Sequence, residues 1–162
     1  GARRVARRHL EAACTRVDDP IVQPVVDAPE ITVDAFYRTD GTLIHYVPRL
    51  RVRTQAGESI QGRTLPDDAL GPWLHAVLTE VGRLGARGPL TLQAFLTDGE
   101  PTLSEINPRF GGGFPLSHEA GAHYPAWLVT AAAGTPVSPR LGDYQSGLCM
   151  TRAYTEFFTT AC

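Results

Sequence analysis

Residues 92–113, LQAFLTDGEPTLSEINPRFGGG, contain the strongest local signals in this sequence. Two β-forming runs, 89–96 and 101–106, flank the dipeptide Asp98-Gly99, which is typical of a tight turn between antiparallel strands. Three consecutive glycines close the stretch and favour a loop, because glycine adopts backbone conformations that other residues avoid. The stretch therefore predicts a β-hairpin that runs into a glycine-rich turn.

Oxygen-bearing side chains recur along the second strand of this hairpin. Glu105 and Asn107 are two residues apart, so both side chains leave the same face of the strand. If residues 98–100 form a three-residue turn, Gln93 lies opposite Glu105 and the three oxygens converge; a two-residue turn would pair Gln93 with Ser104 instead. Carboxylate and amide oxygens suit Mg²⁺, which completes its shell with waters and substrate phosphates. The hairpin is therefore a candidate magnesium site.

Arg109 follows Asn107 by two residues and would place a guanidinium beside such a site, where it could hold an anion. A simpler interpretation is that Glu105 and Asn107 form the solvated face of an edge strand and that Arg109 pairs with Glu105. The glycines lack the spacing of a known phosphate-binding motif and add little to the choice. The residues by themselves leave both interpretations open.

The rest of the chain mixes helical patterns with short β-rich runs. Hydrophobic periodicity predicts helices over residues 4–16, 66–84, 116–120 and 125–133. Further strands are predicted over residues 21–26, 31–37, 42–53, 59–64 and 147–154. No repeat or linker divides the sequence. We therefore expect one domain over residues 1–162, of the α+β class, with a mostly antiparallel sheet and helices packed on one side.

The run 31–37 shows the strand alternation most clearly. Its apolar positions are Ile31, Val33, Ala35 and Tyr37, and the positions between them are Thr32, Asp34 and Phe36. This pattern predicts a sheet with one buried face.

The composition excludes several classes of protein. A chain of 162 residues with 43% hydrophobic residues and a formal net charge of −2 can bury one core and is not mainly disordered. All 15 basic residues are arginines, and the near-neutral balance argues against nucleic-acid binding. The three cysteines are widely spread, and no apolar run is long enough for a membrane span or a signal peptide. These features favour a cytoplasmic protein.

Two longer stretches resemble a known family. EINPRFGGGFPLSHEAGAHYPAWLV, residues 105–129, closely resembles the C-terminal signature of ATP-grasp ligases, in the branch of the carbamoyl phosphate synthase large chain and its amino-acid ligase relatives. IVQPVVDAPEITVDAFY, residues 21–37, resembles the nucleotide hinge of that family, and residues 47–58 resemble its next hairpin. The resemblance covers nearly the whole chain and implies the C-terminal subdomain of the ATP-grasp fold.

The resemblance also implies roles for individual residues. The implied ligands of the metal ions that bridge the ATP phosphates are Gln93, Glu105 and Asn107. Arg109 would contact the acyl phosphate or its carboxylate. The implied nucleotide contacts are Gln23, Val25 and Val26 for adenine and Glu30 for the ribose. Arg49 and Arg51 would either reach phosphate or product, or lie at the surface.

The activity implied is ATP-dependent ligation with Mg²⁺ or Mn²⁺, in which a small carboxylate becomes an acyl phosphate and reacts with an amine or similar nucleophile. The N-terminal domain and most of the lid of such enzymes have no counterpart here, and residues 1–5 resemble the end of the glycine-rich lid loop. We therefore expect the C-terminal portion of a ligase, inactive by itself, either as a homodimer or joined to the missing portion. The alternative is a non-catalytic nucleotide-binding or assembly module that a partner chain completes.

Overall fold

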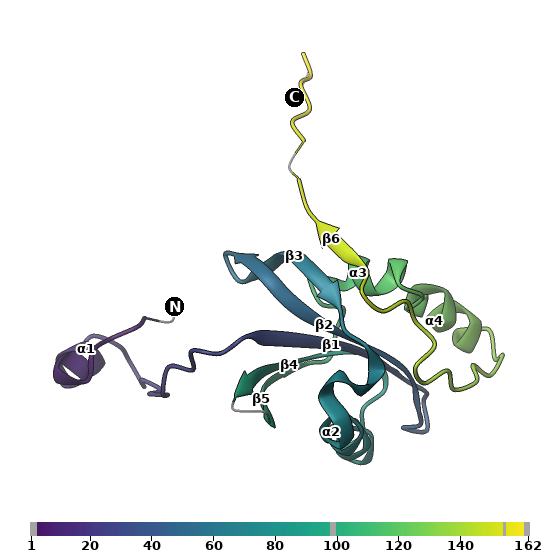
Figure 1. The fold of residues 1–162 in the computed structure, drawn as a ribbon, viewed down its shortest axis with the longest axis horizontal. Helices are drawn as coiled ribbons and strands as arrows, with labels where there is room; N and C mark the ends of the chain where they lie inside the picture. The colour runs from purple at the N-terminus through teal and green to yellow at the C-terminus, as the bar shows by residue number, and fades with distance from the viewer. Residues whose placement is uncertain (1–2, 98–99, 154, 161–162) are drawn as a thin grey trace.

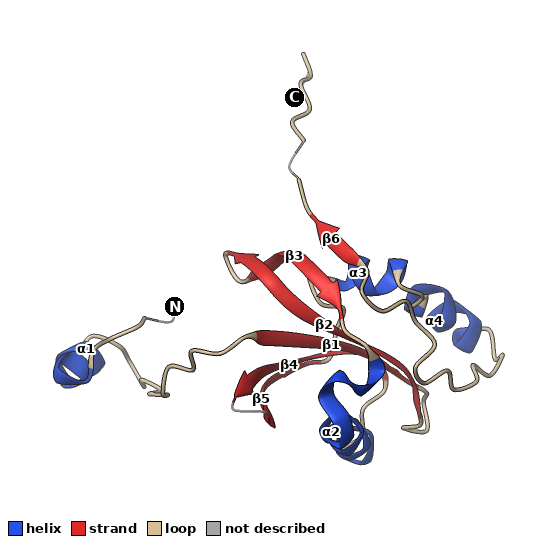
Figure 2. Cartoon of the chain, in the orientation of Figure 1, coloured by secondary structure: helices blue, strands red, loops and turns tan. Residues whose placement is uncertain are grey.

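The structure is a computed structural model that describes residues 3–97, 100–153 and 155–160. Its centre is a six-stranded antiparallel sheet in the order β5-β4-β1-β2-β3-β6 (Figures 1 and 2). The strands are β1 (Glu30–Tyr37), β2 (Leu43–Gln55), β3 (Glu58–Thr64), β4 (Gly88–Thr97), β5 (Glu100–Asn107) and β6 (Cys149–Thr151). The expected α+β class and antiparallel sheet are confirmed. The last strand is shorter than the predicted run 147–154, of which residue 154 lies outside the described residues.

In the described ranges of the chain, six helical segments connect or flank these strands. They are η1 (Arg7–His9), α1 (Leu10–Cys14), η2 (Asp67–Leu70), α2 (Gly71–Arg83), α3 (Phe114–Glu119) and α4 (Tyr124–Ala132). The helix predicted over residues 66–84 is split because Gly71 has a φ of +52°, which ends the 3₁₀ turn before α2 begins. No helix in the described part of the chain has the length and apolar character needed to cross a membrane.

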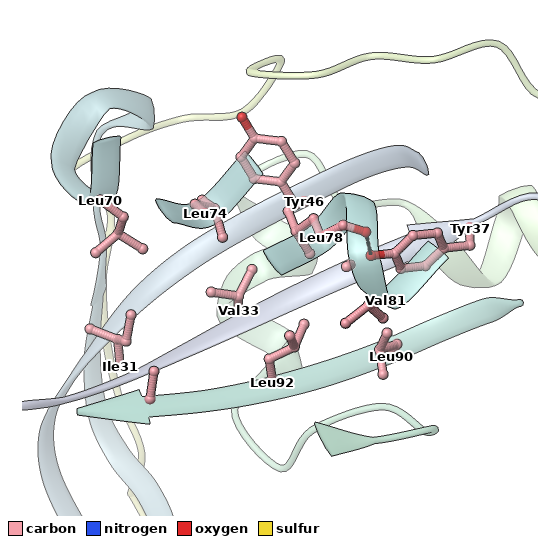
Figure 3. Packing of buried hydrophobic residues seen from close by; sticks show 12 residues of the cluster. Ile31, Val33, Tyr37, Tyr46, Leu70, Leu74, Leu78, Val81, Leu90 and Leu92 are labelled. Atoms are coloured by element: carbon pink, nitrogen blue, oxygen red, sulfur yellow. Dashed lines mark hydrogen bonds between the residues drawn. The ribbon is translucent and has the colours of Figure 1, made fainter. Parts of the chain in front are cut away.

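One face of the sheet packs against α2 and forms the larger core. Ile31, Val33 and Leu92 point from β1 and β4 toward Leu74 and Leu78 of α2 (Figure 3). The Tyr37 hydroxyl donates a 2.8 Å hydrogen bond to the carbonyl of Leu78, also drawn in Figure 3. The apolar stripe predicted for this helix is therefore the surface that meets the sheet.

The opposite face carries a second core, so the helices are not all on one side as expected. Phe36 of β1 and Val47 of β2 pack against Phe114 of α3 and Tyr124 of α4. Phe36 alternates with the residues that face α2, which places it on the other side of the strand. The prediction of a single buried face was wrong for β1, because this strand lies inside the sheet and both of its faces are covered.

The run predicted as a strand over residues 21–26 is not part of the sheet. It belongs to an exposed segment that leads from α1 to β1, and α1 stands apart from the sheet (Figure 1). Ile21 is 87% exposed. Pro20 and Pro24 lack the backbone N–H that a strand pairing requires, which explains why β-forming residues alone did not make a strand here.

A buried histidine joins the second core to the chain beyond α4. His45 is fully buried, and its Nε2 donates to the carbonyl of Asp143 at 3.0 Å, since a carbonyl can only accept. Nδ1 lies 3.1 Å from the hydroxyl of Tyr124, which itself donates to the carbonyl of Asp34 at 3.1 Å. Burial lowers the pKa of His45, while the Asp143 carbonyl opposes this shift. Burial therefore favours the neutral form of His45 in the folded protein.

We predict that acid destabilises the fold through His45. Because the folded-state pKa is depressed, the unfolded chain binds the proton more readily, so the stability is full above a pH of about 6.5 and falls as the pH drops below it. Urea unfolding of wild type and His45→Gln at pH 7.5 and 5.5 measures this effect. The variant should lose less stability between the two pH values than wild type does, whereas His9→Gln, at an exposed position, should behave like wild type. Equal pH dependence in all three proteins would contradict this assignment.

Candidate functional site

The sheet register places the predicted metal ligands on one face. Thr32 of β1 pairs with Gln93 of β4, and Gln93 pairs with Glu105 of β5. Asn107 lies two residues beyond Glu105 and pairs with Thr91. Successive residues of a strand point to opposite faces, so Gln93, Glu105 and Asn107 share a face.

The predicted three-residue turn is not the cause of this alignment. Thr97 pairs directly with Glu100, so two residues, 98 and 99, connect the strands, and their own structure lies outside the described residues. The register shifts between Gln93 and Ala94, where Ser104 is the extra residue of β5, and its hydroxyl donates to the carbonyl of Gln93 at 3.1 Å. This β-bulge brings Glu105 opposite Gln93 despite the short connection.

Arg51 connects the predicted ribose and metal residues. Its Nη1 donates to Oε1 of Glu30 and, at 2.6 Å, to Oε1 of Gln93, while Nη2 donates to the carbonyl of Gly57 at 2.6 Å. The Gln93 amide in turn donates to Oε2 of Glu105 at 2.8 Å. Four of the residues predicted from the sequence therefore form one chain of polar contacts, from the start of β1 to β5.

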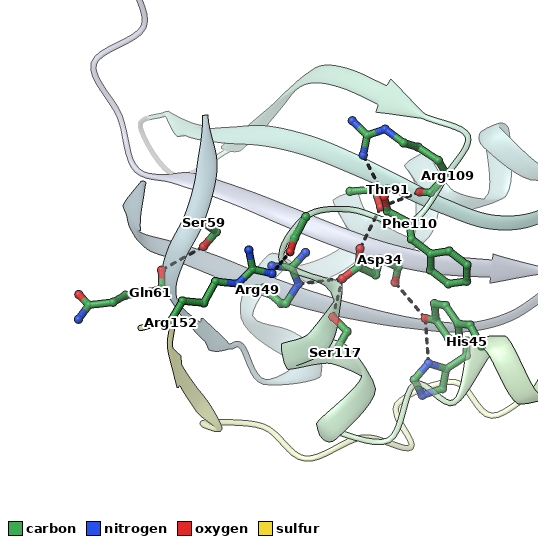
Figure 4. A network of polar contacts seen from close by, with 12 residues as sticks. Asp34, His45, Arg49, Ser59, Gln61, Thr91, Arg109, Phe110, Ser117 and Arg152 are labelled. Atoms are coloured by element: carbon green, nitrogen blue, oxygen red, sulfur yellow. Dashed lines mark hydrogen bonds and ion pairs between the residues drawn. The ribbon is translucent and has the colours of Figure 1, made fainter. Parts of the chain in front are cut away.

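Figure 4 shows a second polar cluster, which is almost completely buried. Asp34 and Arg49 are each 1% exposed, and Nε of Arg49 donates to Oδ2 of Asp34 at 2.8 Å. The hydroxyls of Ser117 and Thr91 donate to the same carboxylate at 2.5 and 2.9 Å. The Thr91 hydroxyl also lies 3.1 Å from the carbonyl of Arg109, which links the cluster to the turn after β5.

The glycine turn packs directly on this cluster. A Cβ on Gly111 would lie 2.9 Å from Thr91, and one on Gly113 would overlap Nη1 of Arg49. A Cβ on Gly112 would meet Glu58 at 3.6 Å, an ordinary contact. Two of the three glycines are therefore needed because the backbone approaches other groups closely, rather than for a phosphate-binding motif.

Both polar clusters border a cavity of about 210 Å³. Its lining includes Arg49, Arg51 and Arg109, together with Gln93 and the glycine turn. Glu105 is exposed on the edge strand β5, as the simpler interpretation expects. Arg109, however, donates to the carbonyl of Phe110 at 3.0 Å and, within the described residues, forms no ion pair with Glu105. The cavity is rich in guanidinium groups and is therefore suited to anions.

Among the residues that the structure describes, two buried nitrogen atoms at this face have no hydrogen-bond partner. They are Nη1 of Arg49 and Nδ2 of Asn107. A buried N–H without an acceptor costs about 1–3 kcal/mol, so such atoms are uncommon unless a ligand uses them. A half-turn of the Asn107 amide would present its oxygen in the same place, which suits a cation.

The donor set fits a divalent metal ion that takes part of its shell from a ligand. The described residues contain no cluster of three or more His, Cys, Asp or Glu side chains that could hold a metal ion, so a metal ion at this face would need the amide oxygens of Gln93 and Asn107 beside Glu105. Hard oxygen donors of this kind suit Mg²⁺. Metal binding at Gln93 would replace the hydrogen bond that its Oε1 accepts from Arg51.

The residues predicted to contact adenine lie outside this cavity. Gln23, Val25 and Val26 are exposed in the segment before β1, and Gln23 and Val25 line a separate hollow beside α1. Sequence reasoning missed Asp34, Thr91 and Ser117, although they anchor the site. The only available signal for Asp34 was a carboxylate at the centre of an otherwise apolar run.

Comparison with known proteins places this chain in a family. A family model described as "ATP-grasp in the biosynthetic pathway with Ter operon" matches residues 16–154. The chain belongs to the ATP-grasp family. No curated protein matches the chain.

Solved structures of biotin carboxylases share the ATP-grasp fold of this chain. The biotin carboxylase domain of thermophilic 2-oxoglutarate carboxylase bound to bicarbonate has a TM-score of 0.62 at 15% identity and covers 78% of this chain. The domain dimer from Hydrogenobacter thermophilus with MgADP, ADP and bicarbonate gives 0.62 at 16% over 78%, and the biotin carboxylase subunit of pyruvate carboxylase gives 0.61 at 17% over 75%. The chain spans 30%, 29% and 28% of the lengths of these three proteins.

We predict that the Asp34–Arg49 pair is essential for stability. Asp34→Ala leaves a buried guanidinium uncompensated and should lower the free energy of unfolding by about 3–5 kcal/mol. Asp40→Ala removes the partner of Arg38 in an exposed pair and should have a much smaller effect. Urea unfolding of wild type, Asp34→Ala and Asp40→Ala measures both effects. Equal losses of unfolding free energy in the two variants would show that burial of the Asp34–Arg49 pair is unimportant.

Proposed function

We propose that this chain supplies the metal and phosphate side of an ATP-dependent ligase site. In the reaction, a carboxylate oxygen takes the γ-phosphoryl group of ATP and ADP leaves; an amine or similar nucleophile then attacks the acyl carbon, loses its proton to solvent, and phosphate leaves. The observation that carries the proposal is the shared face of Gln93, Glu105 and Asn107 beside a cavity lined with arginines. Membership of the ATP-grasp family supports it.

The metal side of the proposed site consists of three ligands and one arginine. Gln93, Glu105 and Asn107 would hold Mg²⁺ or Mn²⁺ through their oxygens, with Glu105 supplying the only negative charge of the three. These ligands would hold the ion where its positive charge offsets the negative charge of the phosphate groups. Arg109 would donate N–H groups to the acyl phosphate or to its parent carboxylate. Thr91 supports this role, because its hydroxyl touches the backbone of Arg109.

The nucleotide side is built from residues that precede and start β1. Gln23 and the backbone of Val25 and Val26 would contact adenine, and the Glu30 carboxylate would accept hydrogen bonds from the ribose hydroxyls. Arg51 bonds one oxygen of Glu30 and so orients this carboxylate relative to Gln93. Arg51 thereby couples the ribose and metal positions.

The substrate side is proposed to take a small carboxylate. A solved structure with this fold contains both MgADP and bicarbonate, which is a small anion of related chemistry. The guanidinium-lined cavity next to the metal ligands would be the corresponding place in this chain.

We predict that Glu105→Gln weakens metal-dependent ATP binding. The variant keeps the shape of the side chain but removes the charge that holds Mg²⁺ against its hydration shell, so the affinity for MgATP should fall on the order of tenfold or more, while metal-free ATP should bind as before. Calorimetric titration of the full-length gene product with ATP, with and without Mg²⁺, measures both affinities. Turnover is followed in parallel and should fall as well.

Glu80→Gln is the matched control for this experiment. Glu80 pairs with Arg83 on the exposed surface of α2, which packs on the opposite face of the sheet. This variant should bind MgATP as wild type does. If Glu105→Gln also leaves affinity and turnover unchanged, the metal assignment and the ligase proposal both fail; binding without any turnover in wild type would instead favour a nucleotide-binding module.

A further inference from the structure

The guanidinium of Arg49 has more donors than the protein uses. The side chain lies at the middle of the sheet and is 1% exposed. Its Nε binds Asp34, but Nη1 is buried and has no acceptor among the described residues. An arginine that is present only to neutralise a carboxylate would usually offer it two parallel N–H bonds.

Asp34 does not need the remaining donors, because other groups already satisfy it. Oδ2 accepts from Arg49 and Ser117, and Oδ1 accepts from Thr91. The hydroxyls of Ser117 and Thr91 thus occupy acceptor positions that a second N–H group of Arg49 could have used. Asp34 therefore holds Arg49 by its Nε edge and leaves the Nη1 edge free for another acceptor.

The Arg49 side chain borders the cavity. Arg49 and Gly113 both line it, and Gly113 lacks the Cβ that would overlap Nη1. The only carboxylate that lines the cavity among the described residues is Glu58, which is paired with Arg152 at 3.2 Å. Within the described part of the chain, no acceptor is thus positioned for Nη1, although the cavity lined by Arg49 can admit a small ligand.

The register separates Arg49 from the metal ligands. Thr32 pairs with Gln93 on one side and with Arg49 on the other, so Arg49 and Gln93 lie two strands apart. At a strand spacing of about 4.8 Å, their backbones are roughly 10 Å apart. A carboxylate phosphorylated at the metal side is therefore a different group from one that binds at Arg49.

We propose that Arg49 binds a second carboxylate of the substrate, so that the site takes a small dicarboxylate-type molecule. One carboxylate lies toward Arg109 and the metal ligands, and the other accepts from Nη1 of Arg49. This assignment of substrate class rests on the proposed ligase function, whereas the anion subsite itself does not. Asp34, Ser117 and Thr91 are positioning residues that orient Arg49. The buried guanidinium gains its missing acceptor when substrate binds, which gives selectivity for ligands that carry the second group.

The test compares succinate with acetate, without nucleotide, by NMR titration of the protein at constant ionic strength. Wild type should bind succinate at least on the order of tenfold more tightly than acetate, because only succinate reaches both arginines. Gly113→Ala places a methyl group against Nη1 and should reduce succinate binding to the level of acetate. Gly112→Ala, whose Cβ meets only ordinary contacts, should keep the preference.

A second variant covers the case in which Gly113→Ala disturbs folding. Asp34→Asn with Arg49→Gln replaces the buried ion pair by a neutral pair, and it should abolish the preference for succinate. Asp40→Asn with Arg38→Gln makes the same change in an exposed pair and should keep it. The proposal is overturned if wild type shows no preference, or if the preference survives in the folded cavity variants.

Two further measurements separate the possible sources of the anion. If inorganic phosphate displaces succinate competitively and its binding depends on Arg49, the subsite belongs to a phosphate group and the dicarboxylate assignment is overturned. Succinate that binds together with MgATP supports the assignment. The ligase proposal can fail separately. In that case the protein does not bind MgATP, but succinate still binds and its binding still depends on Arg49.

Discussion

The contact between Asp34 and Arg49 joins strands β1 and β2 at the centre of the sheet, and the hydroxyls of Thr91 and Ser117 bring β4 and α3 to the same carboxylate. A carboxylate that is 1% exposed is stable only when its oxygens are paired and hydrogen-bonded. The polar face of the sheet therefore depends on this cluster. If one partner is missing, the others are left as buried charges or unsatisfied hydroxyls.

The two faces of β1 contact different parts of the protein. One face packs Ile31 and Val33 against α2 and supplies most of the apolar burial. The other face begins with Glu30, Thr32 and Asp34, which form the polar site, and continues with Phe36, which packs under α3 and α4. The second core thus closes one end of this face and leaves the cavity at the other end. Rigid strands carry most of the site residues, so their spacing is set by the sheet.

Local irregularities determine how the site residues meet. The extra residue at Ser104 shifts β5 by one position and brings Glu105 opposite Gln93. The glycine turn lets the backbone approach Thr91 and Arg49 more closely than any other residue would allow. Without either feature the same side chains would occupy the same strands with a different geometry.

Local patterns in the sequence predicted the hairpin of β4 and β5 and the hydrophobic periodicity of α2. They also predicted the shared face of Gln93, Glu105 and Asn107. These features depend on alternation and spacing along short segments. The prediction that Gln93 lies opposite Glu105 rested on a three-residue turn, which was wrong. The β-bulge at Ser104 gives the same pairing with a two-residue connection. Only the tertiary structure showed that Asp34 is buried, that Arg49 keeps a free donor and that residues 21–26 form no strand. These properties depend on which distant segments cover a strand, and strand alternation does not specify those partners.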